Sequence, residues 1–476
     1  MLEQYKKSPC FGISNVRRAI LINENDKTTG SIVSDSIISA FFEQCNELKK
    51  NVEMDKDMIL INTIKRINAH ANLSSDERVA QLIIMNKIPS ILTNLFKEFF
   101  IEERNEDMLD DLCINVQSSC NMEVVILIFF QQFSYYSELI SEEFIKLGLI
   151  DLICHKIRFL HKTSHKYALN VLGNLIGTDY IMKYNVNYNN ILDIAFDEIY
   201  KSDNCIVENA GGWLLSKIAC RADLFSTPQK MTIVSSFIEL FLSKIPSIYS
   251  DILGGILFII DNSPILLKNS KLCEGILRVT LFGIKNLIEN SLYHSLCIAC
   301  ILYKNLDINV ISIFHNQVSV KKLINLLYEP NINIKKATIN LFICIVKYQS
   351  ELISTLYLND AFLAINQLFL SSSFDEKLPL LMIMVESCIN GGKALVYYLV
   401  ESNYFISSIF EFLSSDITGI EEYCFKSLVI CLSYQETYEH TKQQIILEGG
   451  LEYLESYKTN NESVATLLEQ IKQFFI

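Results

Sequence analysis

The feature that most constrains the fold of this chain is a helical apolar pattern that repeats at a fixed distance. Apolar residues recur every three or four positions along most segments, which is the spacing of an amphipathic helix. In the segment 165–179 the face opposite the apolar stripe carries Asn170, Asn174 and Thr178. The same arrangement returns ~43 residues later. The equivalent positions there are Trp213, Lys217 and Arg221.

Further steps of ~41–43 residues connect equivalent positions from 131 to 430. A second signal, in the phrases NKIPSILTNLF, LGLIDLICHKI, SNYFISSIFEFL and GGLEYLESY, marks where repeats begin. A period of ~40–47 residues with two or three helices per repeat is typical of HEAT and armadillo proteins. We therefore predict an all-α, armadillo-repeat, right-handed superhelical solenoid of about ten three-helix repeats. It covers residues 46–476, after an N-terminal segment of residues 1–45 that is mobile to about residue 40.

Stacked repeats of this kind align the third helix of each repeat along one continuous groove. The face that carries Asn170 and Asn174, and then Trp213 and Lys217, lines that groove. Trp213 is the single tryptophan of 476 residues, and two glycines precede it in ENAGGWLLSKIACR. The alternative for Trp213 is that it packs between helices without a role in binding.

Charge and composition exclude several classes of function. A net charge of −13 argues against nucleic acid as a partner, because phosphate binding draws on clustered Lys and Arg. The longest uncharged apolar runs stay below the ~18 residues of a membrane span, and the N-terminus lacks the apolar stretch of a signal peptide. We expect no membrane insertion, and localisation in the cytoplasm and nucleus.

The 14 cysteines are scattered through apolar runs, so we interpret them as reduced core residues. Cys297 and Cys300 form one CxxC, but no second pair has the spacing of a structural zinc site. His161 and His165 have the spacing of metal ligands on a helix, yet they lie in a polar link and have no carboxylate nearby in the sequence. The chain carries no Walker or dinucleotide glycine loop and no nucleophile elbow. We expect no enzyme activity, no cofactor and no metal site.

Four phrases resemble the importin-alpha (karyopherin-alpha) family of armadillo proteins, in the family's order and at its distances. They are NVLGNLIGTD (170–179), WLLSKIACR (213–221), DILGGILFIID (251–261) and NGGKALVYYLVE (390–401). NINIKKATINLFICIV (331–346) is also similar to a phrase of that family. In most repeats of the family the third helix carries Trp-x-x-x-Asn on its groove face. The resemblance covers residues 85 to 476.

The resemblance implies a nuclear import adaptor, which binds Lys/Arg-rich nuclear localisation signals and links them to importin-beta. Asn amides would pair with the peptide backbone, Trp faces would hold Lys stems, and carboxylates along the rim would complete the charge match. A nuclear export receptor is a further expected partner. The basic residues expected to bind importin-beta are Lys6, Lys7, Arg17 and Arg18. The expected peptide-binding residues are Gln131, Asn170, Asn174, Thr178, Asp179, Trp213, Lys217, Asp251, Phe258 and Asp261.

The sequence also departs from the family's pattern. Asn170 stands where the family has Trp, and Lys217 stands where it has Asn. Lys has donors and no acceptor, and its charge lies one turn from the Trp213 slot, so Lys217 weakens the expected binding of a basic peptide. The N-terminal segment is only weakly basic, and an ordinary flexible N-terminus explains it equally well. The alternative function is therefore a protein-interaction scaffold that kept the armadillo fold and lost signal binding.

Overall fold

The computed structural model describes residues 35–53, 57–98 and 113–476, apart from residues 244, 403, 416 and 418. Every regular element in these ranges is a helix, and they contain no strand, which confirms the all-α prediction. The packing divides the chain into two compact units. The N-terminal unit ends at Ile259, and the C-terminal unit runs from Ile260 to Ile476.

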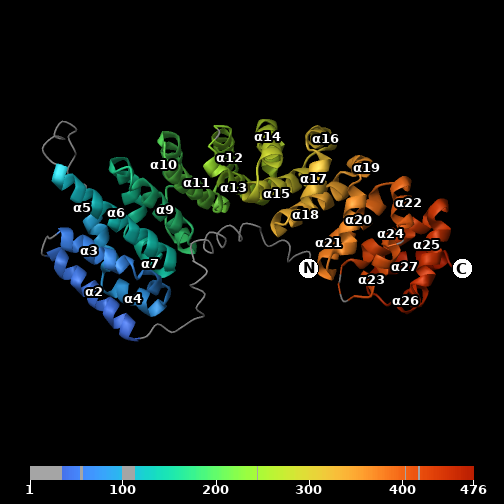
Figure 1. Cartoon of the computed structure of the whole chain (residues 1–476), viewed down its shortest axis with the longest axis horizontal. Coiled ribbons are helices and arrows are strands. Elements are labelled where there is room, and N and C mark those ends of the chain that lie inside the picture. The colour runs from blue at the N-terminus through green and yellow to red at the C-terminus, as the bar shows by residue number, and fades with distance from the viewer. Residues whose placement is uncertain are drawn as a thin grey trace. The chain divides into compact units, whose positions relative to one another are not determined.

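Figure 1 labels most helices of the two units. Those that begin in the N-terminal unit are α2 (Asp35–Glu53), α3 (Asp57–Asn68), α4 (Glu77–Met85), α5 (Ile88–Glu98), α6 (Cys113–Tyr136), α7 (Glu138–Lys146), α8 (Leu149–Lys156), α9 (His165–Ile176), α10 (Tyr188–Lys201), α11 (Cys205–Ala219), α12 (Thr227–Leu242) and α13 (Tyr249–Asn262). Those of the C-terminal unit are α14 (Ser270–Asn286), α15 (Glu289–Asn305), α16 (Ile308–Gln317), α17 (Val320–Leu326), α18 (Ile332–Tyr348), α19 (Ile353–Leu358), α20 (Ala361–Ser371), α21 (Phe374–Asn390), α22 (Lys393–Glu401), α23 (Phe405–Leu413), α24 (Glu421–Ser433), α25 (Gln435–Leu447), α26 (Gly450–Ser456) and α27 (Glu462–Gln473).

One helix of each repeat packs on its counterpart in the next repeat, and we call these the stacked helices. In the N-terminal unit α3, α6, α9 and α11 pack in this order. In the C-terminal unit the order is α15, α18, α21, α24 and α27. The apolar stripe predicted for α9 is buried, since Ala168, Val171 and Leu172 have no exposed surface. The periodic pattern therefore predicted both the helices and the face through which they stack.

Left-handed backbone recurs at one place in the repeat. Two shorter helices, the first and the second of a repeat, precede a stacked helix. The residue in the turn between them has positive φ at four points. They are Lys87 (φ 59°), Gly148 (φ 74°), Asp360 (φ 61°) and Gly449 (φ 67°). Glycine adopts this conformation without a steric penalty, whereas Lys and Asp pay a modest one. Three of the four phrases expected to mark where repeats begin contain this turn, so they mark the start of a second helix and that expectation was wrong for them.

Side chains at the end of one stacked helix bond to backbone carbonyls of the preceding stacked helix. Asn174 donates to the Gln131 carbonyl at 2.8 Å, and Arg221 donates to the Ile176 carbonyl at 3.2 Å. In the C-terminal unit Gln349 donates to Tyr303, and Asn390 donates to Val346. The sequence separations are 43, 45, 46 and 44 residues. These bonds satisfy carbonyls near helix ends and tie each repeat to the one before it.

Within the described ranges, no individual helix combines the length and the apolar composition that a bilayer crossing requires. Two bent pairs of helices pass the same test by length and composition alone. The acidic segment 101–111, which the sequence predicts to be a solvated loop, lies outside the described residues. Residues 1–34 also lie outside them, and helix α2 spans the predicted boundary between residues 45 and 46.

Candidate functional site

Trp213 lies on α11 with its ring against α9. A Cβ atom at Gly173 of α9 would lie 2.4 Å from Cζ3 of Trp213, so only glycine leaves room for the indole. The side chain is half-buried. Trp213 therefore packs between α9 and α11, and part of its surface stays accessible.

The two glycines before Trp213 allow α11 to approach its other neighbours. A Cβ at Gly211 would lie 2.6 Å from Cγ1 of Ile199 in α10. A Cβ at Gly212 would lie 2.7 Å from Cγ2 of Ile248. Helix α11 tolerates two residues of low helix propensity because its flanks are packed this closely, and because the Asn204 side chain caps its first turn.

Lys217 lies one turn after Trp213 on the same helix face. Its ammonium Nζ is 5.4 Å from the Trp213 ring centroid, within the range of a cation–π interaction. Its aliphatic stem passes over the end of α9, where Cδ would be 3.6 Å from a Cβ at Gly177. A lysine of this chain therefore already lies at the ring that was predicted to receive a lysine of a bound peptide.

The Asn174 amide is engaged within the protein. Its Nδ2 group donates to the Gln131 carbonyl at 2.8 Å and to Ser134 Oγ at 3.0 Å, both on α6. Both N–H bonds of the amide are thereby used, so a peptide carbonyl would have to displace one of them. Asn170 and Gln131 are half-buried on the same stretch of stacked helices.

The end of α9 is held by Arg221, a residue for which the sequence suggested no role beyond its position. Its guanidinium donates to the carbonyls of Ile176, Gly177 and Thr178, at 3.2, 3.1 and 2.7 Å. It also pairs with the exposed Asp179 at 3.3 Å. A cation at these carbonyls complements the negative end of the helix dipole.

Thr178 differs from its expected place on an open face. The residue is buried, and its hydroxyl donates to the Leu175 carbonyl at 2.8 Å. Helix α9 stops at Ile176, and Gly177 caps it, so Thr178 lies in the turn after the helix and not on its groove face. The exposed acid beside this turn is instead Asp179.

The acids of α13 occupy two different environments. Asp251 is 6% exposed and lies against α11, where its Oδ2 would be 3.4 Å from a Cβ at Gly212. It is therefore a buried acid and not one of an open rim. Phe258 is half-buried. Asp261 is exposed at the end of α13, and partial desolvation of its carboxyl raises its pKa while the charge of Lys304 opposes that shift.

A second cation–aromatic cluster lies in the C-terminal unit and was not predicted. Lys347 Nζ is 5.5 Å from the Tyr423 ring centroid and 5.8 Å from that of Tyr348. It also pairs with the buried Glu386 at 3.6 Å. The signal that could have indicated it is the position of Lys347 one turn after Cys344 on a stacked helix.

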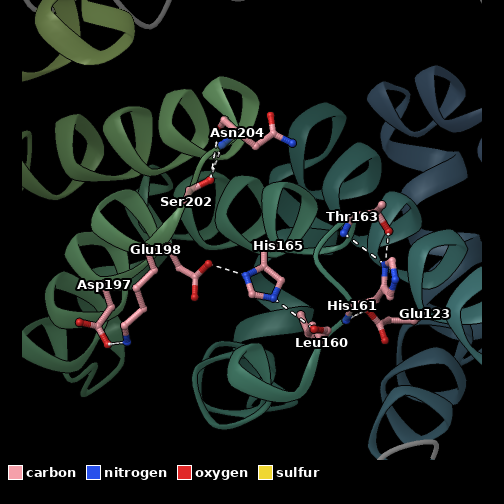
Figure 2. A network of polar contacts seen from close by, with 10 residues as sticks. Glu123, Leu160, His161, Thr163, His165, Asp197, Glu198, Ser202 and Asn204 are labelled. Carbon is pink, nitrogen blue, oxygen red and sulfur yellow. Dashed lines mark hydrogen bonds and ion pairs between the residues drawn. The ribbon is translucent and has the colours of Figure 1, made fainter. Parts of the chain in front are cut away.

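His161 and His165 bond to separate partners (Figure 2). His161 Nδ1 is 2.9 Å from Thr163 Oγ1. His165 is the first residue of α9, not part of a link before it, and it bonds through Nδ1 to Glu198 and through Nε2 to the Leu160 carbonyl. In the part of the chain that the structure describes, no group of three or more His, Cys, Asp or Glu is arranged to hold a metal ion.

The basic residues Lys6, Lys7, Arg17 and Arg18, which the resemblance relates to importin-beta, lie outside the described residues.

Comparison with known proteins supports the fold and nothing finer. No family profile and no curated protein matches the sequence. Among the solved structures that resemble it is an engineered protein determined as a structural-genomics target. The two share 12% sequence identity over 90% of this chain and 98% of the other, with a TM-score of 0.67. What the comparison identifies is therefore an all-helical repeat architecture.

Proposed function

We propose that this chain is an armadillo-repeat adaptor of the importin-alpha type. It binds Lys/Arg-rich nuclear localisation signals on the face of α9, α11 and α13 and links its cargo to importin-beta, moving between cytoplasm and nucleus. The order and spacing of the phrases around Asn174, Trp213 and Asp251 support this proposal. The all-helical repeat fold is compatible with it.

The observation that carries the proposal is the position of Lys217 against Trp213. An ammonium 5.4 Å from the ring centroid, with its stem lying along α9, is the arrangement that a lysine of a bound signal would adopt. The half-buried indole is thus a binding site for a cation, and in the free protein the Lys217 ammonium of the same chain lies in it. A peptide lysine binds when Lys217 swings away.

The second candidate is a protein-interaction scaffold without signal binding. Two observations favour it. Both N–H groups of the Asn174 amide donate hydrogen bonds to α6, and Asp251 is buried against α11. In this alternative the same groups hold the repeats together, and the partner binds elsewhere on the array.

Exchange of Lys217 for the residue that the family has at this place tests the proposal. Lys217→Asn removes the competing ammonium and its repulsion of a cationic ligand. We expect binding of a synthetic Lys/Arg-rich peptide to tighten about tenfold, equivalent to ~1–2 kcal/mol. Titration calorimetry measures the change, and the affinity should fall as salt is raised.

Lys183→Asn is the matched control. Lys183 is also a lysine beside an aromatic ring, 4.5 Å from the Tyr180 ring centroid, but it is exposed and lies outside the stacked helices. Its replacement removes the same charge and should leave the affinity unchanged. If the wild type and Lys217→Asn both fail to bind the peptide, the scaffold candidate stands and the import-adaptor proposal is wrong.

A further inference from the structure

Helix α14 carries an exposed face on which basic residues recur every seven positions. Lys271, Arg278 and Lys285 are all exposed, and seven residues are close to two full turns of a helix. The three side chains therefore follow one another along α14, with successive members ~10 Å apart, and we call them the basic row. The only acid of this helix is Glu274, which lies between the first two members of the row.

The cations of the basic row are not neutralised within the part of the chain that the structure describes. No ion pair or side-chain hydrogen bond connects Lys271, Arg278 or Lys285 to a described residue. Other lysines of the same unit do pair with acids, as Lys335 does with Glu376 at 3.7 Å. The chain has 54 acidic residues against 41 basic ones, so a row of unpaired cations departs from its overall charge. Such a local positive potential suits an anionic partner.

A further cation lies at the end of the basic row. Lys322, in the first turn of α17, donates from Nζ to the Lys285 carbonyl at 2.7 Å. This bond holds the Lys322 ammonium at the negative end of the α14 dipole. Lys321 precedes it and is exposed. The positive surface therefore extends from the first turn of α14 to the first turn of α17.

Apolar side chains are exposed beside the basic row. Phe282, one turn after Arg278, is 41% exposed, and Ile288, just after the helix, is 73% exposed. Helix α16 packs against α14 (Figure 1), exposes Val310 and Ile313, and contains no Lys, Arg, Asp or Glu. A nucleic-acid backbone or a small anion would pair with the cations and leave these apolar side chains in water. A protein partner can cover both kinds of side chain.

We propose that α14 and the adjoining face of α16 form a docking surface for an acidic amphipathic helix of a partner protein. Carboxylates that recur every seven residues on the partner pair with the basic row, and its Leu or Phe side chains cover Phe282, Val310 and Ile313. Two helices that pack lengthwise meet through positions that recur every seven residues, which is the spacing of the basic row. An extended acidic peptide fits this spacing less well, because its side chains alternate with a period of two.

The docking surface lies on helices other than α9, α11 and α13. The proposal therefore does not depend on the binding of basic signals, and the variant that tests that function separates the two. Lys217→Asn should leave the affinity for an acidic helix unchanged.

The test measures binding of a synthetic helix-forming peptide to the full-length chain by fluorescence anisotropy. The peptide is labelled with fluorescein, spans about three heptads, and has Glu at every seventh position with Leu beside it. We expect saturable binding that weakens as salt is raised, because exposed charges are screened. Arg278→Glu combined with Lys285→Glu should weaken the binding at least about tenfold, since two attractive pairs become repulsive.

Lys426→Glu combined with Lys458→Glu is the matched control. Both lysines are exposed in the same unit, and the change in net charge is the same. The control should bind the peptide within about twofold of wild type. Phe282→Ala tests the apolar part of the surface and should still weaken binding severalfold at high salt, where the charges contribute least.

Three results would overturn the proposal. One is that wild type does not bind the acidic peptide. Another is an equal loss of affinity in the α14 variant and in the control. The third is tighter binding of duplex DNA or of phosphatidylserine vesicles than of the peptide, lost in the α14 variant, which would assign the basic row to a nucleic acid or a membrane. Circular dichroism of each variant establishes that its helices are intact.

Discussion

His165, at the first turn of α9, has an acceptor at each ring nitrogen. Nδ1 bonds to the Glu198 carboxylate, and Nε2 is 3.2 Å from the Leu160 carbonyl (Figure 2). The protonated imidazolium donates from both nitrogens, so this environment favours the charged form. The bond to Glu198 accordingly raises the pKa of His165, with a smaller contribution from the charge of Glu123, against the effect of desolvation.

A pH-dependent contribution to stability follows from the raised pKa. The stabilisation from His165 is fully present below its unfolded pKa of about 6.5 and is lost as pH rises through the higher folded value. His165→Gln should therefore reduce the free energy of unfolding more at pH 6 than at pH 8.5. Urea unfolding at both pH values measures it, with His161→Gln, an exposed imidazole, as control. An equal loss at both pH values would contradict the assignment.

Single residues show how far the sequence could predict the candidate site. Periodicity placed Trp213 and Lys217 on one face of one helix, because that face follows from a spacing of four residues. It could not show that the Lys217 ammonium lies on the Trp213 ring, because a flexible lysine has several rotamers. It also placed Asp251 on an open rim, whereas the approach of α13 to Gly212 buries this acid.

At the scale of the helices, the junction of α9 and α11 depends on the absence of one side chain. A Cβ at Gly173 would lie 2.4 and 2.7 Å from two ring carbons of Trp213, so the ring or one of the helices would have to shift. Gly173→Ala should therefore destabilise the protein by about 1–3 kcal/mol through overpacking. Trp213→Phe shortens the ring and should recover part of this loss in the double variant. Chemical unfolding of the four proteins gives the coupling energy.

Gly255→Ala is the matched control for this cycle. Its Cβ would lie 2.4 Å from Phe237 of α12 and would not meet Trp213. Gly255→Ala should lower the free energy of unfolding by a similar amount, and Trp213→Phe should not restore any of that loss. Equal coupling of Trp213→Phe with both alanine variants would mean that the rescue is not local to the α9–α11 junction.

The elements themselves were predictable to different degrees. Helices and their buried faces follow from apolar spacing, and starts such as that of α11 follow from capping residues such as Asn204. The turn between first and second helices was visible where glycine occupies it, at Gly148 and Gly449. Where Lys87 or Asp360 takes the same left-handed conformation, no residue type signals it, because the packing of the two helices imposes the turn.

At the scale of the whole molecule, each repeat is tied to the previous one by side-chain donors on carbonyls, and Arg221 makes the densest of these links. Arg221→Ala removes donors from the carbonyls of Ile176, Gly177 and Thr178. We expect a loss of about 1–3 kcal/mol, because these bonds are charge-assisted. Hydrogen exchange should accelerate at the end of α9 and in neighbouring helices, while α24 and α27 keep their protection, since repeat arrays are stabilised by nearest neighbours.

Arg158→Ala provides the comparison for this variant, because Arg158 is an exposed arginine of the same unit. It removes one positive charge without removing a link between repeats. Uniform acceleration of exchange across both units in Arg221→Ala would argue against nearest-neighbour stabilisation and for one global transition.

The repeat was the most predictable property of the molecule, because it is encoded redundantly. An apolar stripe that returns every ~40–47 residues leaves few ways to bury all stripes other than stacking. The side-chain links between repeats are not redundant: Asn174, Arg221, Gln349 and Asn390 share a role, but they differ in residue type or in their position within the repeat. A pattern search finds the common stripe and misses links that do not recur at a fixed position.

Because Trp213 packs against Gly173 at one helix junction, its fluorescence is an intrinsic optical probe of that junction. With one indole in 476 residues, ultraviolet emission excited at the tryptophan band originates from a single junction, that of α9 and α11. Circular dichroism averages over all helices at once. Any separation between the emission curve and the dichroism curve on heating is thus a direct reading of how much earlier or later this junction opens than the rest of the array. No label has to be introduced to obtain it.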